Sequence, residues 1–242
     1  MVLEEKNLEM LNDSQRKQVL MQRWLHQHKD FQIDLAITPF GEILEGFIVQ
    51  QGVWNPTIVS ARHHAAYLFY HNGLYYGKKV IDIGSGTGLM GIVMAKYGAK
   101  KVIMSDISKR AVSNSQENIK HFKLDTIASA VEGDLFAGIE EKADCITFMQ
   151  PYFAGNPPEW DTISASMLAN PELIRRFLQN APNYLKPDGV IVMPSFSLAG
   201  ALNDPVVIGK EYWYNITTTF ITDSTTGLQQ GEIAMHELRI KK

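Results

Sequence analysis

Apolar and polar residues form short alternating blocks from residue 79 onward, and these blocks predict strands that alternate with helices. Continuous apolar runs predict strands over residues 79–83, 101–105, 127–131, 143–149 and 189–194. Amphipathic segments between them predict helices over residues 88–97, 108–121 and 171–184. Strands joined by such short helical crossovers lie parallel, with right-handed connections. The pattern therefore predicts an α/β fold with a doubly wound, Rossmann-like and mostly parallel sheet.

The beginning of the chain follows a different pattern. Residues 3–29 are polar, with apolar residues at spacings that predict one or two amphipathic helices. Residues 31–50 contain two apolar runs, the first alternating with period two, on either side of Pro39-Phe40-Gly41, and they predict a β-hairpin. We therefore expect an N-terminal extension of helices and a hairpin over residues 1–52, followed by one main domain over residues 53–242.

The end of the chain predicts a second hairpin. Two β-rich runs, Tyr212–Thr222 and Gly231–Ile240, are separated by the turn-forming residues Asp223–Gly227. Pairing between these runs would place one antiparallel C-terminal strand in the otherwise parallel sheet.

Composition narrows the classes of protein to which the chain can belong. The 242 residues carry a formal net charge of −3 and are 45% hydrophobic, which predicts a sizeable core and no overall basic surface for nucleic acid. Cys145 is the only cysteine, which excludes an internal disulfide and a cysteine-based zinc site. The pair His63-His64 has no second ligand pair at metal spacing, and we interpret it as a solvated helix start.

Membrane and secretion signals are absent from the sequence. No segment approaches the ~18–20 apolar residues of a membrane span, and the first residues do not form an apolar signal segment. We expect a cytoplasmic protein with no membrane or metal partner. The sequence leaves the oligomeric state open.

A glycine-rich loop follows the first strand of the main domain. Gly84-Ser85-Gly86-Thr87-Gly88 comes directly after the apolar run that ends at Ile83, and a helix is expected next. Glycines allow the backbone to turn tightly and to approach a ligand closely, and the N–H groups at a helix start can bind it. Two acids follow at later strand ends: Asp106 can accept two hydrogen bonds from a ribose diol, and Asp134 lies beside the expected adenine. The alternatives are that Asp106 caps the following helix and that Asp134 is a turn residue.

A nicotinamide cofactor is the first alternative to weigh. Gly86-Thr87-Gly88-Leu89-Met90-Gly91 satisfies the dinucleotide pattern, and Asp106 follows Gly86 by 20 residues. The loop, however, begins at Gly84, and Asp82 precedes that glycine by two residues. A carboxylate there can reach a cationic amino-acid group, which S-adenosyl-L-methionine has and NAD lacks. We therefore expect S-adenosyl-L-methionine.

Residues 79–153 resemble the core of the class I, seven-strand S-adenosylmethionine-dependent methyltransferases. Asp82–Gly88 resembles the first motif of that family, Ser105-Asp106-Ile107 its ribose-binding strand end, and Asp134-Leu135 its adenine-side acid. The resemblance implies a seven-stranded sheet with an antiparallel last strand and methyl transfer by in-line displacement at the sulfonium. The cofactor-binding residues that we expect are Asp82, Gly84, Ser85, Gly86, Gly88, Asp106, Ile107, Asp134, Leu135 and Met149.

Two subfamilies share this resemblance. Val53-Trp54-Asn55-Pro56 and Tyr97–Val102 are similar to segments of the protein-lysine methyltransferases. Methyltransferases of glutamine, adenine or guanine amino groups carry Asn-Pro-Pro-Tyr after the fourth strand, where this chain has Met149-Gln150-Pro151-Tyr152-Phe153. Counting from Asp144 places Met149 at the Asn, and a shift of one residue places Gln150 there instead. Met149 is a poor hydrogen-bond acceptor, whereas Gln150 can hold an amino group so that its lone pair faces the methyl.

The residues after the fourth strand are therefore our catalytic candidates: Gln150, Pro151, Tyr152 and Phe153. Tyr152 and Phe153 can form a flat wall for a planar substrate, or they can simply pack in the core. Asn156–Trp160 is interpreted as a lid segment with Trp160 toward substrate. We expect an N-methyltransferase of a protein side chain, Lys or Gln. The alternatives are a nucleic-acid base amine or a small molecule as acceptor, and a catalytically lapsed cofactor-binding scaffold.

Overall fold

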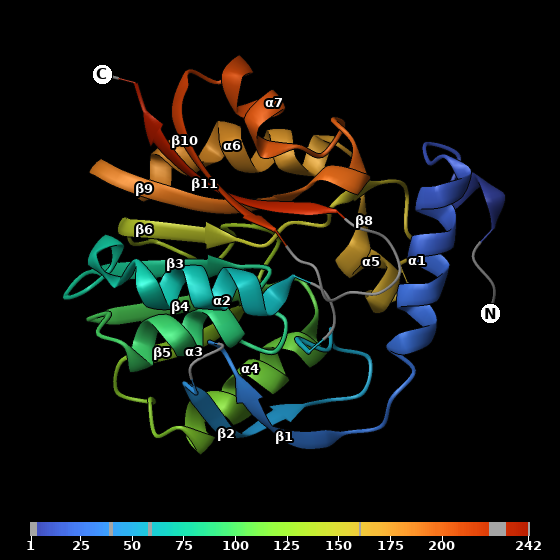
Figure 1. Cartoon of the computed structure of the whole chain (residues 1–242). Helices are drawn as coiled ribbons and strands as arrows, with labels where there is room; N and C mark the ends of the chain where they lie inside the picture. Colours follow the sequence, from blue (N-terminus) through green and yellow to red (C-terminus); the bar gives the residue numbers. More distant parts are fainter. Residues whose placement is uncertain (1–3, 39–40, 58–59, 160, 223–230, 242) are drawn as a thin grey trace.

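A seven-stranded sheet forms the centre of the molecule (Figure 1). The computed structural model describes residues 4–38, 41–57, 60–159, 161–222 and 231–241. The strand order is β10-β11-β9-β6-β3-β4-β5. These strands are β3 (Lys79–Ile83), β4 (Lys101–Asp106), β5 (Ala128–Glu132), β6 (Ala143–Phe148), β9 (Leu185–Phe196), β10 (Tyr214–Thr222) and β11 (Glu232–Ile240).

The directions of the strands confirm the predicted mostly parallel sheet. Strand β3 pairs in parallel with β4 and β6, with Val80 opposite both Val102 and Cys145. Strand β11 runs antiparallel to both β9 and β10, so the predicted C-terminal hairpin supplies the antiparallel strand. The expected turn at Asp223–Gly227 lies outside the described residues.

Helices cover both faces of the sheet because the side chains of each strand alternate between the faces. In β3, Val80 packs into one core cluster, and Ile81 and Ile83 pack into the other. One face is covered by α2 (Ala61–Tyr70), α3 (Leu89–Lys96) and α4 (Lys109–His121), and the other by α6 (Glu172–Tyr184) and α7 (Pro205–Glu211). Short 3-10 turns lie at Asn72–Leu74 and Ser197–Ala199. Within the described ranges, no helix is long and apolar enough to cross a membrane.

The segment between β6 and α6 contains elements that the sequence pattern did not predict. They are β7 (Phe153–Ala154), α5 (Thr162–Met167) and β8 (Leu168–Ala169), and β7 pairs in parallel with β8. Each is too short to show a hydrophobic period, which is why the pattern missed them. Trp160, expected in a lid here, lies outside the described residues.

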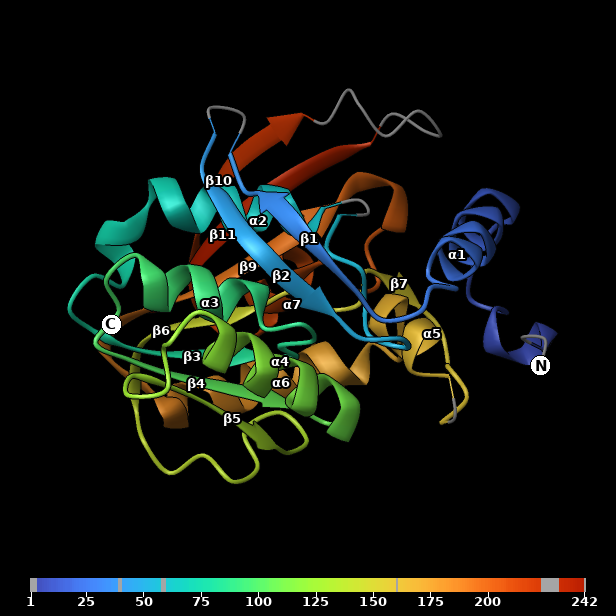
Figure 2. The same ribbon diagram turned by 90° about the horizontal axis from the view of Figure 1, so that it is seen from below.

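The N-terminal residues form the predicted helix and hairpin. They comprise a 3-10 turn (Glu5–Asn7), α1 (Asp13–Leu25), β1 (Phe31–Ala36) and β2 (Ile43–Val49), and residues 39–40 of the expected turn lie outside the described residues. The hairpin lies across α4, and α1 lies beside α5 (Figures 1 and 2). The Asn118 amide of α4 joins the hairpin to the glycine-rich loop. Its Oδ1 accepts from Ile48 N at 2.9 Å, and its Nδ2 donates to Thr87 O at 2.8 Å. The hairpin is thus connected to the glycine-rich loop through the Asn118 side chain.

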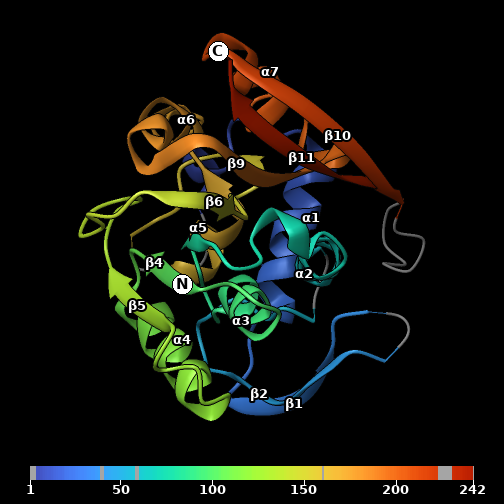
Figure 3. The same cartoon turned by 90° about the vertical axis from the view of Figure 1, so that its left-hand side faces the viewer.

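Figure 3 shows this hairpin and the pair β10–β11 at opposite ends of the molecule. The structure corrects the interpretation of His63-His64 as a solvated helix start. His64 is not a solvated helix residue, because it is fully buried and its Nε2 lies 2.9 Å from Thr147 Oγ1. Burial lowers the pKa of His64 to about 3, so its ring is a neutral core group.

Candidate functional site

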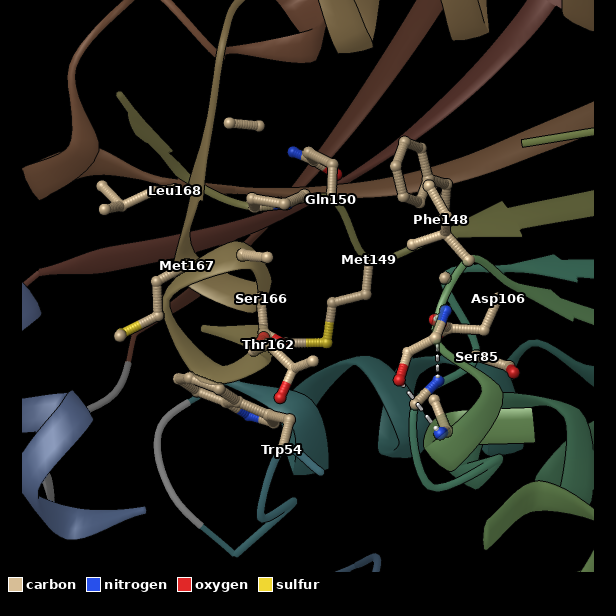
Figure 4. Close-up of a pocket in the computed structure, with 18 of the residues that line it drawn as sticks. Trp54, Ser85, Asp106, Phe148, Met149, Gln150, Thr162, Ser166, Met167 and Leu168 are labelled. Atoms are coloured by element: carbon tan, nitrogen blue, oxygen red, sulfur yellow. Dashed lines mark hydrogen bonds between the residues drawn. The ribbon is translucent and has the colours of Figure 1, made fainter. Parts of the chain in front are cut away.

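A cavity of about 670 Å³ opens where β3, β4 and β6 end (Figure 4). In α/β sheets, ligands bind at the carboxyl ends of the strands, as here. Most of the residues predicted from the sequence line this cavity: Asp82, Gly84, Ser85, Gly86, Asp106, Ile107, Asp134, Leu135, Met149, Gln150, Pro151, Tyr152 and Phe153. Gly88 does not line it.

The glycines of the loop have two different tasks. Gly84, Gly86 and Gly88 all have positive φ, at 63°, 55° and 83°. A Cβ on Gly86 would meet nothing within 4 Å, so this residue leaves the space above the loop open for a ligand. A Cβ on Gly88 would lie 3.0 Å from Ser115 Oγ and 3.3 Å from Met104 Sδ. Gly88 therefore allows α3 to begin close against the neighbouring elements.

Asp82 is a buried carboxyl at the floor of the cavity. Its Oδ2 accepts a hydrogen bond from Gly91 N at 2.9 Å, which ties the end of β3 to the first turn of α3. Burial, with a further contribution from the charge of Asp106, raises the pKa of Asp82 to about 8. A cationic group bound beside Asp82 would favour its ionised form.

Asp106 supports the loop from the neighbouring strand. Its Oδ2 accepts from Gly86 N and its Oδ1 from Ser108 N, each at 2.9 Å, while burial raises its pKa. A carboxylate has about four acceptor positions, and these contacts do not use all of them. The sequence posed ribose binding and helix capping as alternatives, and the geometry has room for both.

The ends of β4 and β5 supply apolar side chains and an exposed acid. Ile107, directly after β4, is 70% exposed, and both Ile107 and Leu135 line the cavity. Asp134 also lines the cavity, but its carboxylate forms an ion pair with Arg176 of α6. Leu135 has φ of 55°, and its carbonyl accepts a hydrogen bond from Ser105 Oγ at 2.8 Å. This contact fixes the turn after β5 against the end of β4.

Residues 149 and 150 point in different directions. Met149 extends into the middle of the cavity (Figure 4). Gln150 is 2% exposed, and its Nε2 donates to Pro194 O at 2.6 Å. Its Oε1 is buried without a partner among the described residues. These directions agree with the register counted from Asp144, in which Met149 takes the Asn position.

Tyr152 and Phe153 are held by different contacts. The Tyr152 hydroxyl lies 2.8 Å from Ser60 Oγ, and burial raises the pKa of this phenol. The Tyr152 ring lies against Phe196, with ring centroids 5.8 Å apart. Phe153 is a buried residue of β7 opposite Leu168. Tyr152 can thus present its ring to a ligand, whereas Phe153 mainly supports the wall from behind.

One wall of the cavity was not predicted from the sequence. It comes from α1 through Gln18 and Gln22 and from α5 through Thr162 and Ser166. The signal for α1 was present, because Gln18 and Gln22 are four residues apart and so share one helix face. The signal for α5 was a helix cap: the Asp161 carboxylate accepts from Ser164 N at 3.0 Å.

Trp54 lies across the cavity from Met149 (Figure 4). Its ring lies against the His26 ring, with centroids 3.8 Å apart and planes inclined by 30°. Burial lowers the pKa of His26 to about 4, so this partner is neutral near pH 7. The sequence singled out Trp54 as part of the Val53–Pro56 resemblance, and the structure puts it in the cavity wall.

Known proteins share this architecture. Residues 66–197 match the family described as Methyltransferase small domain. A putative protein N5-glutamine methyltransferase of Methanocaldococcus jannaschii is 38% identical over 131 residues, covering 51% of this chain and 64% of that protein. A ribosomal protein L11 methyltransferase of Thermosipho africanus is 26% identical over 187 residues, covering 77% and 57%. The chain thus spans less than two thirds of either relative.

A solved structure with the same fold comes from T. thermophilus. It is a 16S rRNA N2 methyltransferase in complex with AdoMet and guanosine, with a TM-score of 0.61 and 18% identity, covering 88% of this chain and 51% of that chain. The family match spans more than half of the chain and includes the glycine-rich loop and all the strand ends around the cavity. The chain therefore belongs to the methyltransferase small domain family, a family of S-adenosylmethionine-dependent methyltransferases.

Proposed function

We propose that this chain transfers a methyl group from S-adenosyl-L-methionine to a nitrogen of a protein side chain, glutamine or lysine. The observation that carries the proposal is one continuous cavity. It joins the glycine-rich loop, with Asp82 and Asp106, to an end formed by Trp54, Met149 and Tyr152. A nucleoside cofactor and an acceptor can therefore meet in the same space.

The cofactor end is built for the chemical groups of this methyl donor. Asp82 would pair with the cationic amino-acid group, Asp106 would accept from the ribose hydroxyls, and Ile107 would pack on the adenine beside Leu135. When bound, S-adenosyl-L-methionine supplies a methyl group on a positively charged sulfur, which is already a strong electrophile. The protein then needs mainly to hold the acceptor nitrogen in line with it.

The acceptor end of the cavity positions the acceptor nitrogen and does not activate it chemically. Tyr152, fixed by Ser60, offers an aromatic face, and Trp54 closes the opposite side. Expulsion of water by these rings and by Met149 would leave the acceptor nitrogen facing the methyl group. We assign this positioning role to residues 149–153 as a group, because Gln150 and Pro151 belong to the segment between β6 and β7 that carries Tyr152.

Charge favours a protein acceptor over a nucleic acid. Among the described residues, no Lys, Arg or His lines the cavity, whereas four acidic residues do: Asp82, Asp106, Asp134 and Glu159. A phosphate backbone is bound through cations and repelled by carboxylates. The two relatives, a putative glutamine methyltransferase and a ribosomal protein L11 methyltransferase by name, point to the same class of acceptor.

Two measurements test this function. Calorimetry with S-adenosyl-L-methionine tests the cofactor end, and transfer of a tritiated methyl group into cell extract tests the acceptor. We expect protease treatment to release the tritium label from the extract macromolecules and nuclease treatment to leave it in place. Label that only nuclease releases would contradict a protein acceptor. Tight cofactor binding without any transfer would favour the alternative of a catalytically lapsed cofactor-binding scaffold. Met149 in the Asn position is the observation that suggests this alternative.

A further inference from the structure

Helix α1 lies outside the residues that match the family, yet it forms one wall of the cavity. The match begins at residue 66, whereas Gln18 and Gln22 of α1 both line the cavity. Figures 1 and 2 both place α1 next to α5, on the acceptor side. The part of the wall that α1 supplies therefore lies outside the matched residues, whereas α5 lies within them.

Contacts at both ends hold α1 across the cavity. Near its start, Gln15 Nε2 donates to the carbonyl oxygens of Leu198 and Ala199, each at 3.0 Å. Near its end, Arg23 Nε donates to Asp161 Oδ2 at 2.6 Å. The Asp161 carboxylate also caps α5, so this ion pair joins the two helices that form the wall.

Between these anchors, Gln22 is a buried polar side chain whose amide oxygen is unused. It is 4% exposed, and its Oε1 has no hydrogen-bond partner among the described residues. A buried acceptor without a donor destabilises a protein, so such groups are seldom left unpaired without a reason. Two further orphaned atoms belong to residues of the same cavity, Trp54 Nε1 and Gln150 Oε1.

We propose that Gln22 binds the methyl acceptor. Its amide oxygen accepts a hydrogen bond from an N–H of an uncharged amide-like group on the substrate. The inference rests on the proposed function and assigns a specificity-determining contact within that site. The Gln22 oxygen can accept and the Trp54 indole N–H can donate, so these two atoms suit a group that carries both N–H and C=O. A neutral amide side chain satisfies a fixed pair of this kind, whereas an ammonium group would leave the Trp54 donor without an acceptor.

The proposal can be tested with small probes in the complex with S-adenosylhomocysteine. Acetamide represents a neutral amide, methylammonium represents a lysine-like cation, and ligand-detected NMR titration measures both affinities. The wild-type chain should bind acetamide about tenfold more tightly than methylammonium, the difference expected from one well-made hydrogen bond. Gln22→Glu should reverse this order, because a carboxylate of nearly the same shape favours the cation.

Gln27→Glu is the matched control. It introduces the same charge just beyond α1, at an exposed residue that does not line the cavity, and it should keep the wild-type order. Gln22→Met has a similar volume and no amide, and it should weaken acetamide binding about tenfold even if the Glu variant does not fold. Wild-type preference for methylammonium, or an unchanged order in folded Gln22→Glu, would overturn the role of Gln22.

The cofactor is measured separately by calorimetry. Binding of S-adenosylhomocysteine within about twofold of wild type in both Gln22 variants is expected, because Gln22 lies on the acceptor side. If the wild-type chain did not bind this cofactor product, the proposed function and the assignment of Gln22 would both be overturned. If it bound the product but not acetamide, only the role of Gln22 would be lost.

Discussion

The two ends of the cavity are built in opposite ways. The cofactor end consists of a backbone loop and two acids that stand at the ends of adjacent strands, all between residues 82 and 106. The acceptor end gathers side chains from α1, Trp54, α5 and the segment after β6. The first depends on the backbone geometry of the loop as well as on its two acids, whereas the second is formed by side chains from separate elements. This difference predicts how each end responds to mutation.

The largest effect is expected at Gly86, where the loop must stay bare. Gly86→Val places a branched side chain at φ of 55° and fills the open space above the loop. A left-handed conformation costs an ordinary residue about 1–2 kcal/mol, and the added methyl groups exclude the ligand. Calorimetry should show at least a ~100-fold loss of affinity for S-adenosyl-L-methionine, about 2.7 kcal/mol or more.

Gly77→Val controls for backbone strain. Gly77 has φ of 70° and open space around its Cβ position, but it does not line the cavity. This variant should lose a similar amount of stability and keep its affinity for the cofactor. Equal loss of affinity in both variants would show that strain, not occupation of the cavity, is responsible.

Asp106→Ala should have the next largest effect on the cofactor end. It removes the acceptor for Gly86 N and Ser108 N as well as the proposed ribose contact. Hydrogen bonds to a charged group contribute about 1.5–3 kcal/mol, so affinity should fall roughly 10- to 100-fold in a calorimetric titration. Glu132→Ala, at an exposed acid opposite Asp106 on β5, should change little. Normal binding by Asp106→Ala would show that the ribose assignment is wrong.

Tyr152 separates the two ends. Tyr152→Ala should leave cofactor affinity within about twofold and reduce methyl transfer about tenfold, since the aromatic surface for the acceptor is lost. Tyr152→Phe keeps the ring and removes the contact with Ser60 Oγ, so its effect on transfer should be smaller. A loss of cofactor affinity as large as the loss of transfer would contradict the division of the cavity into two ends.

The smallest effect concerns pH and Asp82. Because burial holds the pKa of Asp82 at about 8, its carboxyl is mostly protonated at pH 7 and ionises as the pH rises. A cationic ligand favours the ionised form, so the affinity ratio of wild type to Asp82→Asn should grow from about pH 6 to about pH 8, up to roughly tenfold, until the amino group of the ligand loses its own proton. The Asn variant can still accept from Gly91 N. A flat ratio would exclude Asp82 as the partner of the cation.

The fold could be predicted to a large extent from the sequence. The strands at residues 79–83, 101–105 and 143–149 and the C-terminal hairpin are observed within a few residues of their predicted positions. Each has a continuous apolar run or a clear turn signal, so local pattern and tertiary packing agree. The errors fell where a segment is short or where burial contradicts polarity, as in α5 and at His64. A buried histidine paired with Thr147 has no signature in a local pattern.

The sequence by itself determined the cofactor end. A glycine loop between a strand and a helix must expose its N–H groups, and parallel strands must bring their acids to one edge. Only the tertiary structure decided the acceptor end. Arg23 meets Asp161 across 138 residues, and through that contact Gln22 reaches the cavity. Such a meeting depends on how separate elements pack, which no local spacing of residues records.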